Sequence, residues 1–265
     1  MQFFDINTMI GPWSFNDLSF KTADELTHEM QRLRIEKAFV FHSMAKCYDP
    51  RVGNNFLYDE IKGNDNLIGA MVLTPLINTE FGGKEKVYSF MREKRIGAVR
   101  LYPIDHSYLL DDWNVQELFE LTSEQSIPVL LDMRQNSGDL SSQYDKIYSI
   151  ALRYPRTPLI LLTVGYRHLR ITLKLMEKCP NIFLDTSTFI TFRGIEEVVR
   201  LFGSERIVFG SRMPFIEGGI SIGRIIYADI SEADKENIAY KNTMNLLASN
   251  KIFSKGVKRG ERIDN

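Results

Sequence analysis

Side chains suited to acid–base chemistry and anion binding follow several short apolar runs in this 265-residue chain. Arg100, Arg134 and Arg212 carry guanidinium groups, which bind a carboxylate or a phosphate through two parallel hydrogen bonds. His42 stands at the end of one such run, and an imidazole titrates close enough to neutral pH to act as a general base. Asp132 supplies a carboxylate. These residue types predict a site for a small anionic ligand of the carboxylate type.

Two interpretations of these residues remain open. In the first, the guanidinium of Arg212 pairs with Asp132, and the ion pair closes the site. In the second, the arginines hold a ligand. The predicted ligand-binding side chains are Asn7, Arg100, Tyr102, Arg134, Thr163 and Asp185. The predicted catalytic side chains are His42, Asp132 and Arg212. For His42 and Asp185 we also consider ordinary structural roles, as a hydrogen-bonded histidine and as a cap for the following turn.

Aromatic residues stand close to the same polar positions and suggest the shape of a ligand. Large flat side chains can form the walls of a pocket that accepts a flat molecule. They can equally pack loops against one another, and the sequence does not separate these two roles. The residues concerned are Trp13, Phe15, Tyr48 and Tyr102.

Eight apolar runs of strand length must position these side chains. Several of the runs are continuously apolar, as in LILL and AFVF, which is typical of parallel strands covered by helices. The runs cover residues 3–9, 38–42, 67–73, 98–102, 129–133, 159–164, 182–186 and 207–210.

Helical patterns fill the segments between the runs. Thr22 and Glu25 form a capping box, in which a hydroxyl and a carboxylate serve the free N–H groups at a helix start. Asn114 with Glu117 predicts a second helix start, and Ser231 with Asp234 predicts the start of the last helix. Further helices are expected near residues 53–62, 83–95, 141–154, 168–178 and 194–203.

This alternation predicts an α/β protein with a single (β/α)₈ barrel over residues 1–250 and a polar, basic tail over residues 251–265. An open doubly wound sheet is the alternative fold, but the first run lacks the Gly-rich phosphate loop that often follows it there. In a barrel the carboxyl ends of all strands meet at one mouth. We therefore expect the polar strand-end residues to share one site.

Composition excludes several classes of protein. The formal net charge is −1, so neither nucleic acid nor an anionic membrane is an expected partner. Cys47 and Cys179 stand far apart and form no paired zinc motif, which favours reduced thiols in a cytoplasmic protein. The first residues do not resemble a signal peptide. A homodimer formed through the outer helices is an assembly that the sequence leaves open.

The chain resembles the amidohydrolase-related (amidohydrolase 2) family of the metal-dependent hydrolase superfamily. The segment FDINTMIGPW resembles the family's first strand, which reads D-x-H-x-H-x-G, and RIVFGSRMPF resembles its eighth, F-G-S-D-x-P. PLILLTVGYRHLR and KCPNIFLDTSTF resemble the sixth and seventh strands. ISEADKENIAYKNTMNLL is similar to the closing helix, with Asn242 in the place of the family's asparagine. The resemblance covers nearly the whole chain.

The resemblance implies a divalent metal at the barrel mouth, which acidifies a water for attack on a carbonyl or ring carbon. The family's metal-binding positions fall on Asn7, Met9, Asp132, Thr163 and Arg212. Of these, Asp132 is suited to a hard cation, Met9 is a poor zinc ligand, and Arg212 would repel the ion. We therefore predict that the family metal site is absent and that the chain has no cofactor.

Three functions follow from this reading. The first is a barrel that is no longer a conventional hydrolase and binds a small anionic ligand or a partner at its mouth. The second is a metal-independent lactonase-like hydrolase, or a decarboxylase, acting on a small carboxylated substrate. The third is a conventional metal-dependent hydrolase whose ligands lie outside the matched motifs. Function is decided by the site and not by the fold.

Overall fold

Eight parallel strands form one sheet in the computed structural model, which describes residues 1–13 and 20–254. They pair in the order β1-β2-β3-β4-β5-β8-β9-β10. Their bounds are β1 Phe3–Ile10, β2 Ile35–His42, β3 Leu67–Val72, β4 Ile96–Leu101, β5 Val129–Asp132, β8 Leu159–Leu162, β9 Ile182–Asp185 and β10 Ile207–Val208. Each predicted apolar run overlaps one of these strands, which confirms the (β/α)₈ assignment.

The sheet curls until its first and last strands approach each other. The Ile6 amide donates to the Phe209 carbonyl at 2.9 Å, and the Met9 amide donates to the Met213 carbonyl at 3.1 Å. These bonds link β1 to the residues that directly follow β10. The sheet is therefore a nearly closed barrel, and its mouth has a defined rim.

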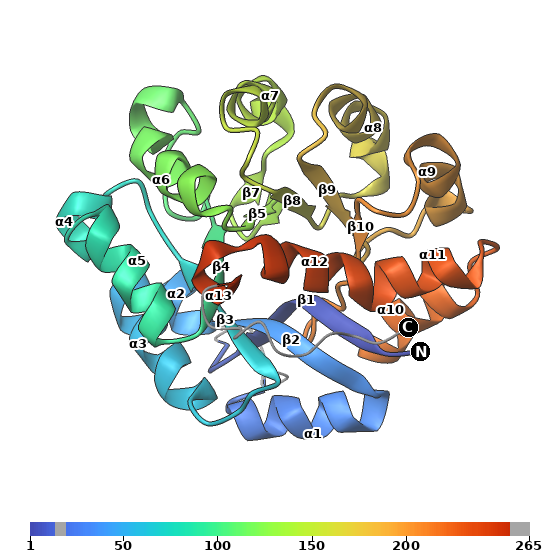
Figure 1. Ribbon diagram of the computed structural model, residues 1–265, viewed down its shortest axis with the longest axis horizontal. Coiled ribbons are helices and arrows are strands. Elements are labelled where there is room, and N and C mark those ends of the chain that lie inside the picture. The colour runs from blue at the N-terminus through green and yellow to red at the C-terminus, as the bar shows by residue number, and fades with distance from the viewer. Residues whose placement is uncertain (14–19, 255–265) are drawn as a thin grey trace.

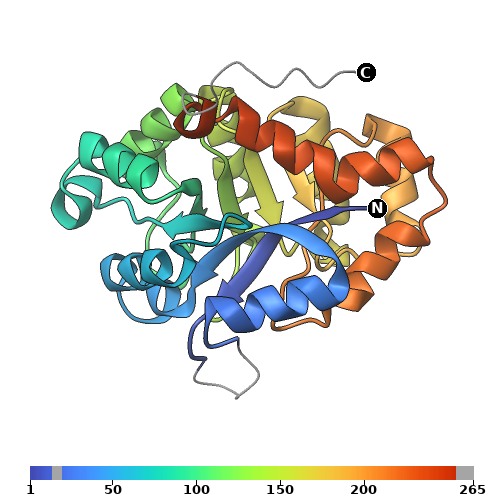
Figure 2. The ribbon, with the colours of Figure 1, turned by 60° about the horizontal axis from the view of Figure 1, so that its bottom comes forward.

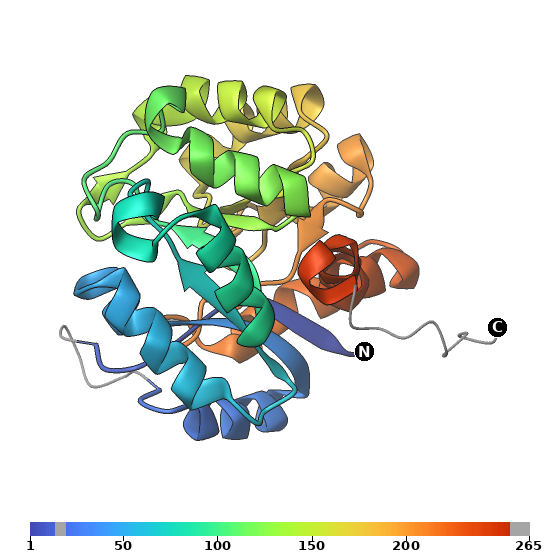
Figure 3. The same ribbon diagram turned by 60° about the vertical axis from the view of Figure 1, so that its left-hand side comes forward.

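Helices surround the barrel on the outside (Figures 1, 2 and 3). A short antiparallel hairpin, β6 (Arg134–Gln135) with β7 (Gly138–Asp139), follows β5 at the mouth. The α-helices are α1 Ala23–Leu33, α2 Ser43–Cys47, α3 Pro50–Ile61, α4 Ile77–Phe81, α5 Lys84–Glu93, α6 Asp112–Gln125, α7 Tyr144–Arg153, α8 Leu169–Lys178, α9 Gly194–Phe202, α10 Gly218–Ile226, α11 Glu232–Glu236, α12 Asn242–Ser249 and α13 Lys251–Ser254. The shorter elements are the 3₁₀ turns η1 Ser141–Gln143 and η2 Tyr166–His168 and the π-helical turn η3 Asn237–Lys241.

Two of the three predicted helix starts are confirmed. Thr22 caps α1 with the full capping box, and the Ser231 hydroxyl accepts the Asp234 amide at the start of α11. The Asn114 prediction was wrong, because α6 begins two residues earlier, at Asp112. The Asn114 side chain turns back and donates to the Leu109 carbonyl at 2.7 Å.

Strand residues alternate between two apolar cores. On β2, Phe39 and Phe41 face the inside of the barrel, whereas Ala38 and Val40 face the layer between strands and helices. Successive side chains of a strand point to opposite faces, and the same alternation continues to the strand ends. It decides which strand-end residue enters the mouth and which packs outside.

The amino-terminal end of the barrel is covered by the last helices, which cross in front of the strands in Figure 1. Leu246 and Leu247 of α12 join the apolar cluster inside the barrel. The Asn242 amide at the start of α12 donates to the carbonyls of Ser204 (2.7 Å) and Ile207 (2.8 Å) beside β10. The predicted tail begins as α13, where Ile252 is buried, and its remainder lies outside the described residues.

Both cysteines, Cys47 and Cys179, are free thiols, as predicted. Among the described residues, no helix has the length and apolar character needed to cross a bilayer.

Candidate functional site

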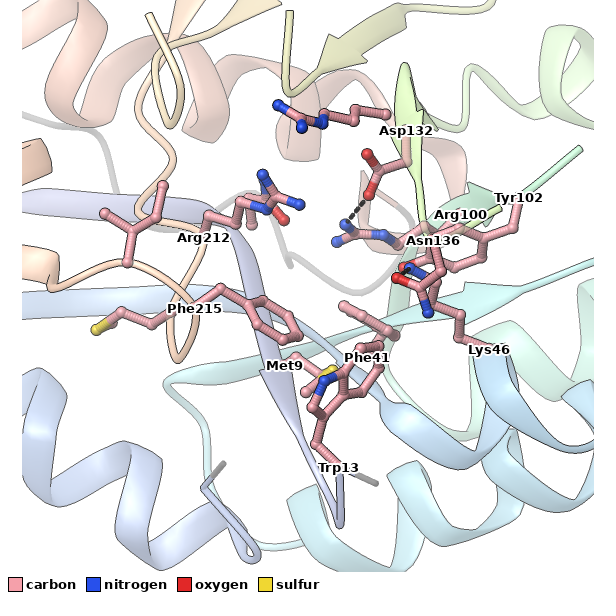
Figure 4. Close-up of a pocket in the computed structure, with 14 residues that line it drawn as sticks. Met9, Trp13, Phe41, Lys46, Arg100, Tyr102, Asp132, Asn136, Arg212 and Phe215 are labelled. Carbon is pink, nitrogen blue, oxygen red and sulfur yellow. Dashed lines mark hydrogen bonds and ion pairs between the residues drawn. The ribbon is translucent and has the colours of Figure 1, made fainter. Parts of the chain in front are cut away.

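A cavity of about 510 Å³ opens at the carboxyl ends of the strands (Figure 4). Six of the nine predicted site residues line it, and they come from strand ends far apart in the sequence. The barrel therefore brings together most of the predicted site. The lining residues are Asn7, Met9, Trp13, Phe41, Lys46, Arg100, Tyr102, Asp132, Arg134, Asn136, Arg212, Met213, Phe215 and Ile216.

A buried ion pair stands at the back of the cavity. Arg100 Nη2 lies 2.9 Å from Asp132 Oδ2, and these side chains are only 3% and 5% exposed. The Thr163 hydroxyl donates to the other oxygen, Asp132 Oδ1, at 2.5 Å. The predicted pair of Arg212 with Asp132 is therefore wrong. Asp132 lies on β5, next to β4, which carries Arg100, whereas β10 is three strands away.

Two donors beside this ion pair have no partner among the described residues. They are Arg100 Nε and the Tyr102 hydroxyl, both fully buried. Burial is the main cause that raises the pKa of the Tyr102 phenol well above its usual value, so the group remains a neutral donor. Buried donors are almost always hydrogen-bonded in proteins. Both groups therefore keep unused hydrogen-bonding capacity beside the cavity.

Two further arginines reach the cavity without a carboxylate partner in the described part of the chain. Arg212 is half-buried, and its guanidinium lies 5.8 Å from the centre of the Phe215 ring. Arg134 is exposed at the rim, on β6. Figure 4 shows Arg212 and Arg100 reaching the same space from opposite sides. The cavity therefore has an excess of cationic groups.

Lys46 also lines the cavity, although it was not among the predicted site residues. Its Nζ lies 3.3 Å from Asp105 Oδ2 and 3.3 Å from Asn136 Oδ1. Burial lowers the pKa of this ammonium, and Arg100 lowers it further, whereas Asp132 and Asp105 raise it. Lys46 belongs to α2, a short helix after β2. No periodicity in the sequence marks the direction of its side chain.

Of the four aromatic candidates, Trp13 and Tyr102 line the cavity. Trp13 meets Phe215 edge to face, with ring centres 4.9 Å apart. Tyr48 is 73% exposed and does not line the cavity. Phe15 lies outside the described residues.

His42 does not line the cavity, so the structure removes it as a candidate base there. Its Nδ1 accepts the Met44 amide at 3.2 Å, and its ring packs 5.5 Å from the Phe56 ring of α3. Burial lowers the pKa of the imidazole. His42 follows Phe41, which faces inward, and therefore points to the outer layer. It has the structural role of a strand-end histidine that caps α2.

Asp185 and Thr163 do not line this cavity, although Thr163 lines a second cavity beside it. Asp185 is fully buried and accepts the Ser187 amide at 2.9 Å and the Thr163 amide at 3.3 Å. The side-chain nitrogen Nδ2 of Asn7 also donates to Asp185, at 3.3 Å. Asp185 thus caps the turn after β9, which is its predicted structural role. Thr163 positions Asp132, and its hydroxyl also accepts the Arg134 amide at 3.1 Å.

A second acid, Asp5, is fully buried near Asp185. Its Oδ1 accepts the amides of Asn7 (3.0 Å) and Ser211 (2.9 Å), while Oδ2 has no partner among the described residues. Burial, together with repulsion from Asp185, raises the pKa of Asp5 to about 6, although its hydrogen bonds oppose the rise.

The residues at the family's metal-binding positions do not fit a divalent ion. Asp132 is already bound by Arg100 and Thr163, and Arg212 brings a positive charge to the position of an anionic ligand. Met9 offers only a thioether, which is a poor ligand for hard cations. Residues 1–13 and 20–254 contain no group of three His, Cys, Asp or Glu side chains placed to hold a metal. We therefore derive no chemistry through a metal.

Comparisons with known proteins agree with the fold. A family model described as amidohydrolase matches residues 56–248. No curated protein matches the chain. Among solved structures, an uncharacterised TIM-barrel protein from Bordetella bronchiseptica has a TM-score of 0.72 at 16% identity, covering 94% of this chain and 99% of that chain.

Two decarboxylases are similarly related in structure. The 2,6-dihydroxybenzoate decarboxylase from Rhizobium has a TM-score of 0.72 at 15% identity, covering 93% of this chain and 99% of that chain. A dihydroxybenzoic acid decarboxylase from Polaromonas, solved with bound manganese and the inhibitor 2-nitroresorcinol, has a TM-score of 0.71 at 14% identity, covering 92% and 96%. At these identities the likeness shows the fold alone.

We expect Arg100→Met to destabilise the protein by about 3–5 kcal/mol, because it leaves the Asp132 charge buried without its counter-ion. The double variant Arg100→Met/Asp132→Leu should be less destabilised than the single variant, since both charges are gone. Urea unfolding of the three proteins measures this. Additive losses in the double variant would show that the two side chains are not energetically coupled.

We expect Asp5 to make stability fall as the pH rises. Its folded pKa of about 6 exceeds the usual 3.8, so its stabilising contribution is fully present below pH 3.8 and is lost as the pH rises through 6. At 1.36 kcal/mol per pKa unit, the loss is about 3 kcal/mol. Asp5→Asn removes this titration. The difference in unfolding free energy between wild type and variant should therefore change between about pH 4 and about pH 7, and a constant difference would contradict the assignment.

Proposed function

The chain belongs to the amidohydrolase family, and from this premise we propose that its barrel mouth binds a small planar carboxylate through arginine side chains and not through a metal ion. One observation carries the proposal. Lys46, Arg100, Arg134 and Arg212 line a cavity in which Asp132, the one carboxylate among the described lining residues, is already neutralised by Arg100.

The excess positive charge supports an anionic ligand. Lys46 has its own counter-ion in Asp105, whereas Arg134 and Arg212 form no ion pair among the described residues. A guanidinium binds a carboxylate with two parallel hydrogen bonds, and such bonds are stronger than those between neutral groups. Cationic groups in a cleft also raise the local concentration of anions. A carboxylate between Arg100 and Arg212 would complete the site.

The remaining lining supports a flat ligand body. Phe41, Tyr102, Trp13 and Phe215 present aromatic surface to the cavity. The Arg100 guanidinium already lies 4.1 Å from the centre of the Phe41 ring, which holds it in place from one side. A ligand ring can pack between these walls, and an oxygen on the ring can accept from the unpartnered Tyr102 hydroxyl.

The same geometry disfavours hydrolysis. A water-activating base must lie within hydrogen-bond reach of the reacting water. His42 lies outside the cavity, and both oxygens of Asp132 are engaged by Arg100 and Thr163. Among the described lining residues, no other group can accept a proton as a carboxylate or imidazole. These contacts favour binding over a lactonase-like reaction.

Decarboxylation is a second candidate, favoured by the position of Lys46. Loss of CO₂ from a hydroxylated aromatic acid needs a proton donor and no hydrolytic base. The Lys46 ammonium would give a proton to the ring carbon that carries the carboxylate. The bond to the carboxylate then breaks, its electron pair returns to the ring, and CO₂ leaves. The amine regains a proton from water, with Asp105 beside it as a relay. The two decarboxylases of similar fold make this reaction class a natural one to assay.

We expect benzoate to bind and benzamide, its neutral counterpart, to bind at least about tenfold more weakly in isothermal titration calorimetry. Arg212→Gln should weaken benzoate binding by about tenfold, through the loss of a charge-assisted hydrogen bond. Arg170→Gln is the matched control, because Arg170 is exposed on α8 and does not line the cavity. Benzoate binding that appears only after zinc or manganese is added would refute the metal-independent site.

If the site decarboxylates, Lys46→Met should lower the turnover of hydroxybenzoates by about 10²–10⁴-fold, the usual contribution of a general acid. The dissociation constant of the hydroxybenzoate should change far less than the turnover. The assay is CO₂ release, together with deuterium uptake into the ring in heavy water. Lys174→Met, on the outer face of α8, is the control. Turnover that is unaffected by Lys46→Met would exclude this role of the lysine.

A further inference from the structure

A second cavity, of about 580 Å³, opens at the same end of the barrel. It lies over the ends of β5, β8 and β9, and it is bounded by the β6–β7 hairpin and η2. Arg134 and Ile216 line both this cavity and the first one. The two cavities are therefore neighbours with a shared wall, and Arg134 stands at their junction.

The second cavity is also cationic. Arg134, Arg167 and Arg224 line it, and Asp139 is its only carboxylate among the described lining residues. Three positive charges therefore face one negative charge. Asp139 forms no ion pair in the described part of the chain; its Oδ1 accepts the Ser141 amide at 2.9 Å. A second anionic group would be attracted to this space.

Arg224 is held in place by backbone groups and still has free donors. Its Nη1 donates to the carbonyls of Ser187 (2.6 Å) and Thr186 (3.3 Å). Its other guanidinium N–H groups have no partner among the described residues. A guanidinium fixed through one nitrogen loses little additional freedom when the others bind a ligand.

Polar and aromatic side chains complete the wall. Arg167 donates through Nε to the Tyr166 hydroxyl at 3.1 Å, which leaves its terminal nitrogens available. The rings of Tyr144 and His168 stack with centres 5.9 Å apart. All four residues line the second cavity. Its lining thus resembles that of the first cavity, with arginines beside flat apolar surface.

We propose that the two cavities form one elongated site for a ligand with an anionic group at each end. This inference rests on the proposed function, which places a carboxylate in the first cavity. The second cavity would hold a second carboxylate or a phosphate near Arg167 and Arg224. Arg134, at the junction, would contact the middle of the ligand or either anion. The substrate class is then an extended dianion and not a simple monocarboxylate.

Calorimetry with rigid aromatic acids tests this directly. Terephthalate, biphenyl dicarboxylate and terphenyl dicarboxylate are each compared with the monocarboxylate of the same ring count. We expect the dianion of the best length to bind at least about tenfold more tightly than its monoanion. A phosphonate in place of the distal carboxylate shows which anion the second cavity prefers. Equal affinities within every pair would overturn the inference.

The variant Arg167→Gln distinguishes binding in the second cavity from binding in the first. We expect it to reduce the affinity for the best dianion to about that of the monoanion while leaving benzoate binding unchanged. Arg170→Gln, three residues away and outside both cavities, should change neither. Equal weakening of benzoate and dianion by Arg167→Gln would overturn the inference. If benzoate binds and no dianion gains affinity, only the elongated site fails; if neither benzoate nor any monocarboxylate binds, the proposed function fails.

Discussion

A guanidinium and a carboxylate lie 2.9 Å apart inside the barrel, where both are almost fully removed from water. Each charge would be costly to bury alone, so Arg100 and Asp132 depend on each other. The pair also decides the character of the mouth. It occupies the carboxylate that stands at one of the family's metal-binding positions, and it holds Arg100 against the Phe41 ring. With Asp132 neutralised by Arg100, the arginines nearer the rim, Arg134 and Arg212, form no ion pair among the described residues.

The two acids beneath the mouth, Asp5 and Asp185, have a structural role that differs from that of Asp132. Asp5 and Asp185 form no ion pair among the described residues, yet both are fully buried and bound by backbone amides. A carboxylate that accepts two amide hydrogen bonds fixes the chain around it. Here the two acids fix the turn after β9 and the segment after β10. Buried polar side chains therefore fix the backbone beneath the mouth, where the ligand site is proposed.

Much of this arrangement follows from simple rules, and its exceptions have physical causes. Strand order and two-residue alternation would have paired Arg100 with Asp132, because β4 and β5 are adjacent and both side chains share the inward face of Phe41 and Leu130. The same alternation places His42 outside. The interpretation that paired Arg212 with Asp132 rested on their opposite charges at two of the family's metal-binding positions and did not consider strand order. Lys46 could not be predicted, since the direction of a short helix after a strand depends on tertiary packing and not on local pattern.

The backbone conformation of two strand-end residues bears on whether the mouth is merely closed by an ion pair. Thr163 and Arg212, both at family metal-binding positions, have φ values of 57° and 61°, in the left-handed region. This conformation costs about 1–2 kcal/mol for a residue with a side chain, and it persists only where the surroundings enforce it. Asp185 holds the Thr163 amide, and Asp5 holds the Ser211 amide beside Arg212. The Thr163 turn also serves the ion pair, because its hydroxyl donates to Asp132, whereas the Arg212 turn does not, because Arg212 contributes nothing to the pair. Strain that aims an unpaired guanidinium into a cavity is the arrangement expected of a binding site.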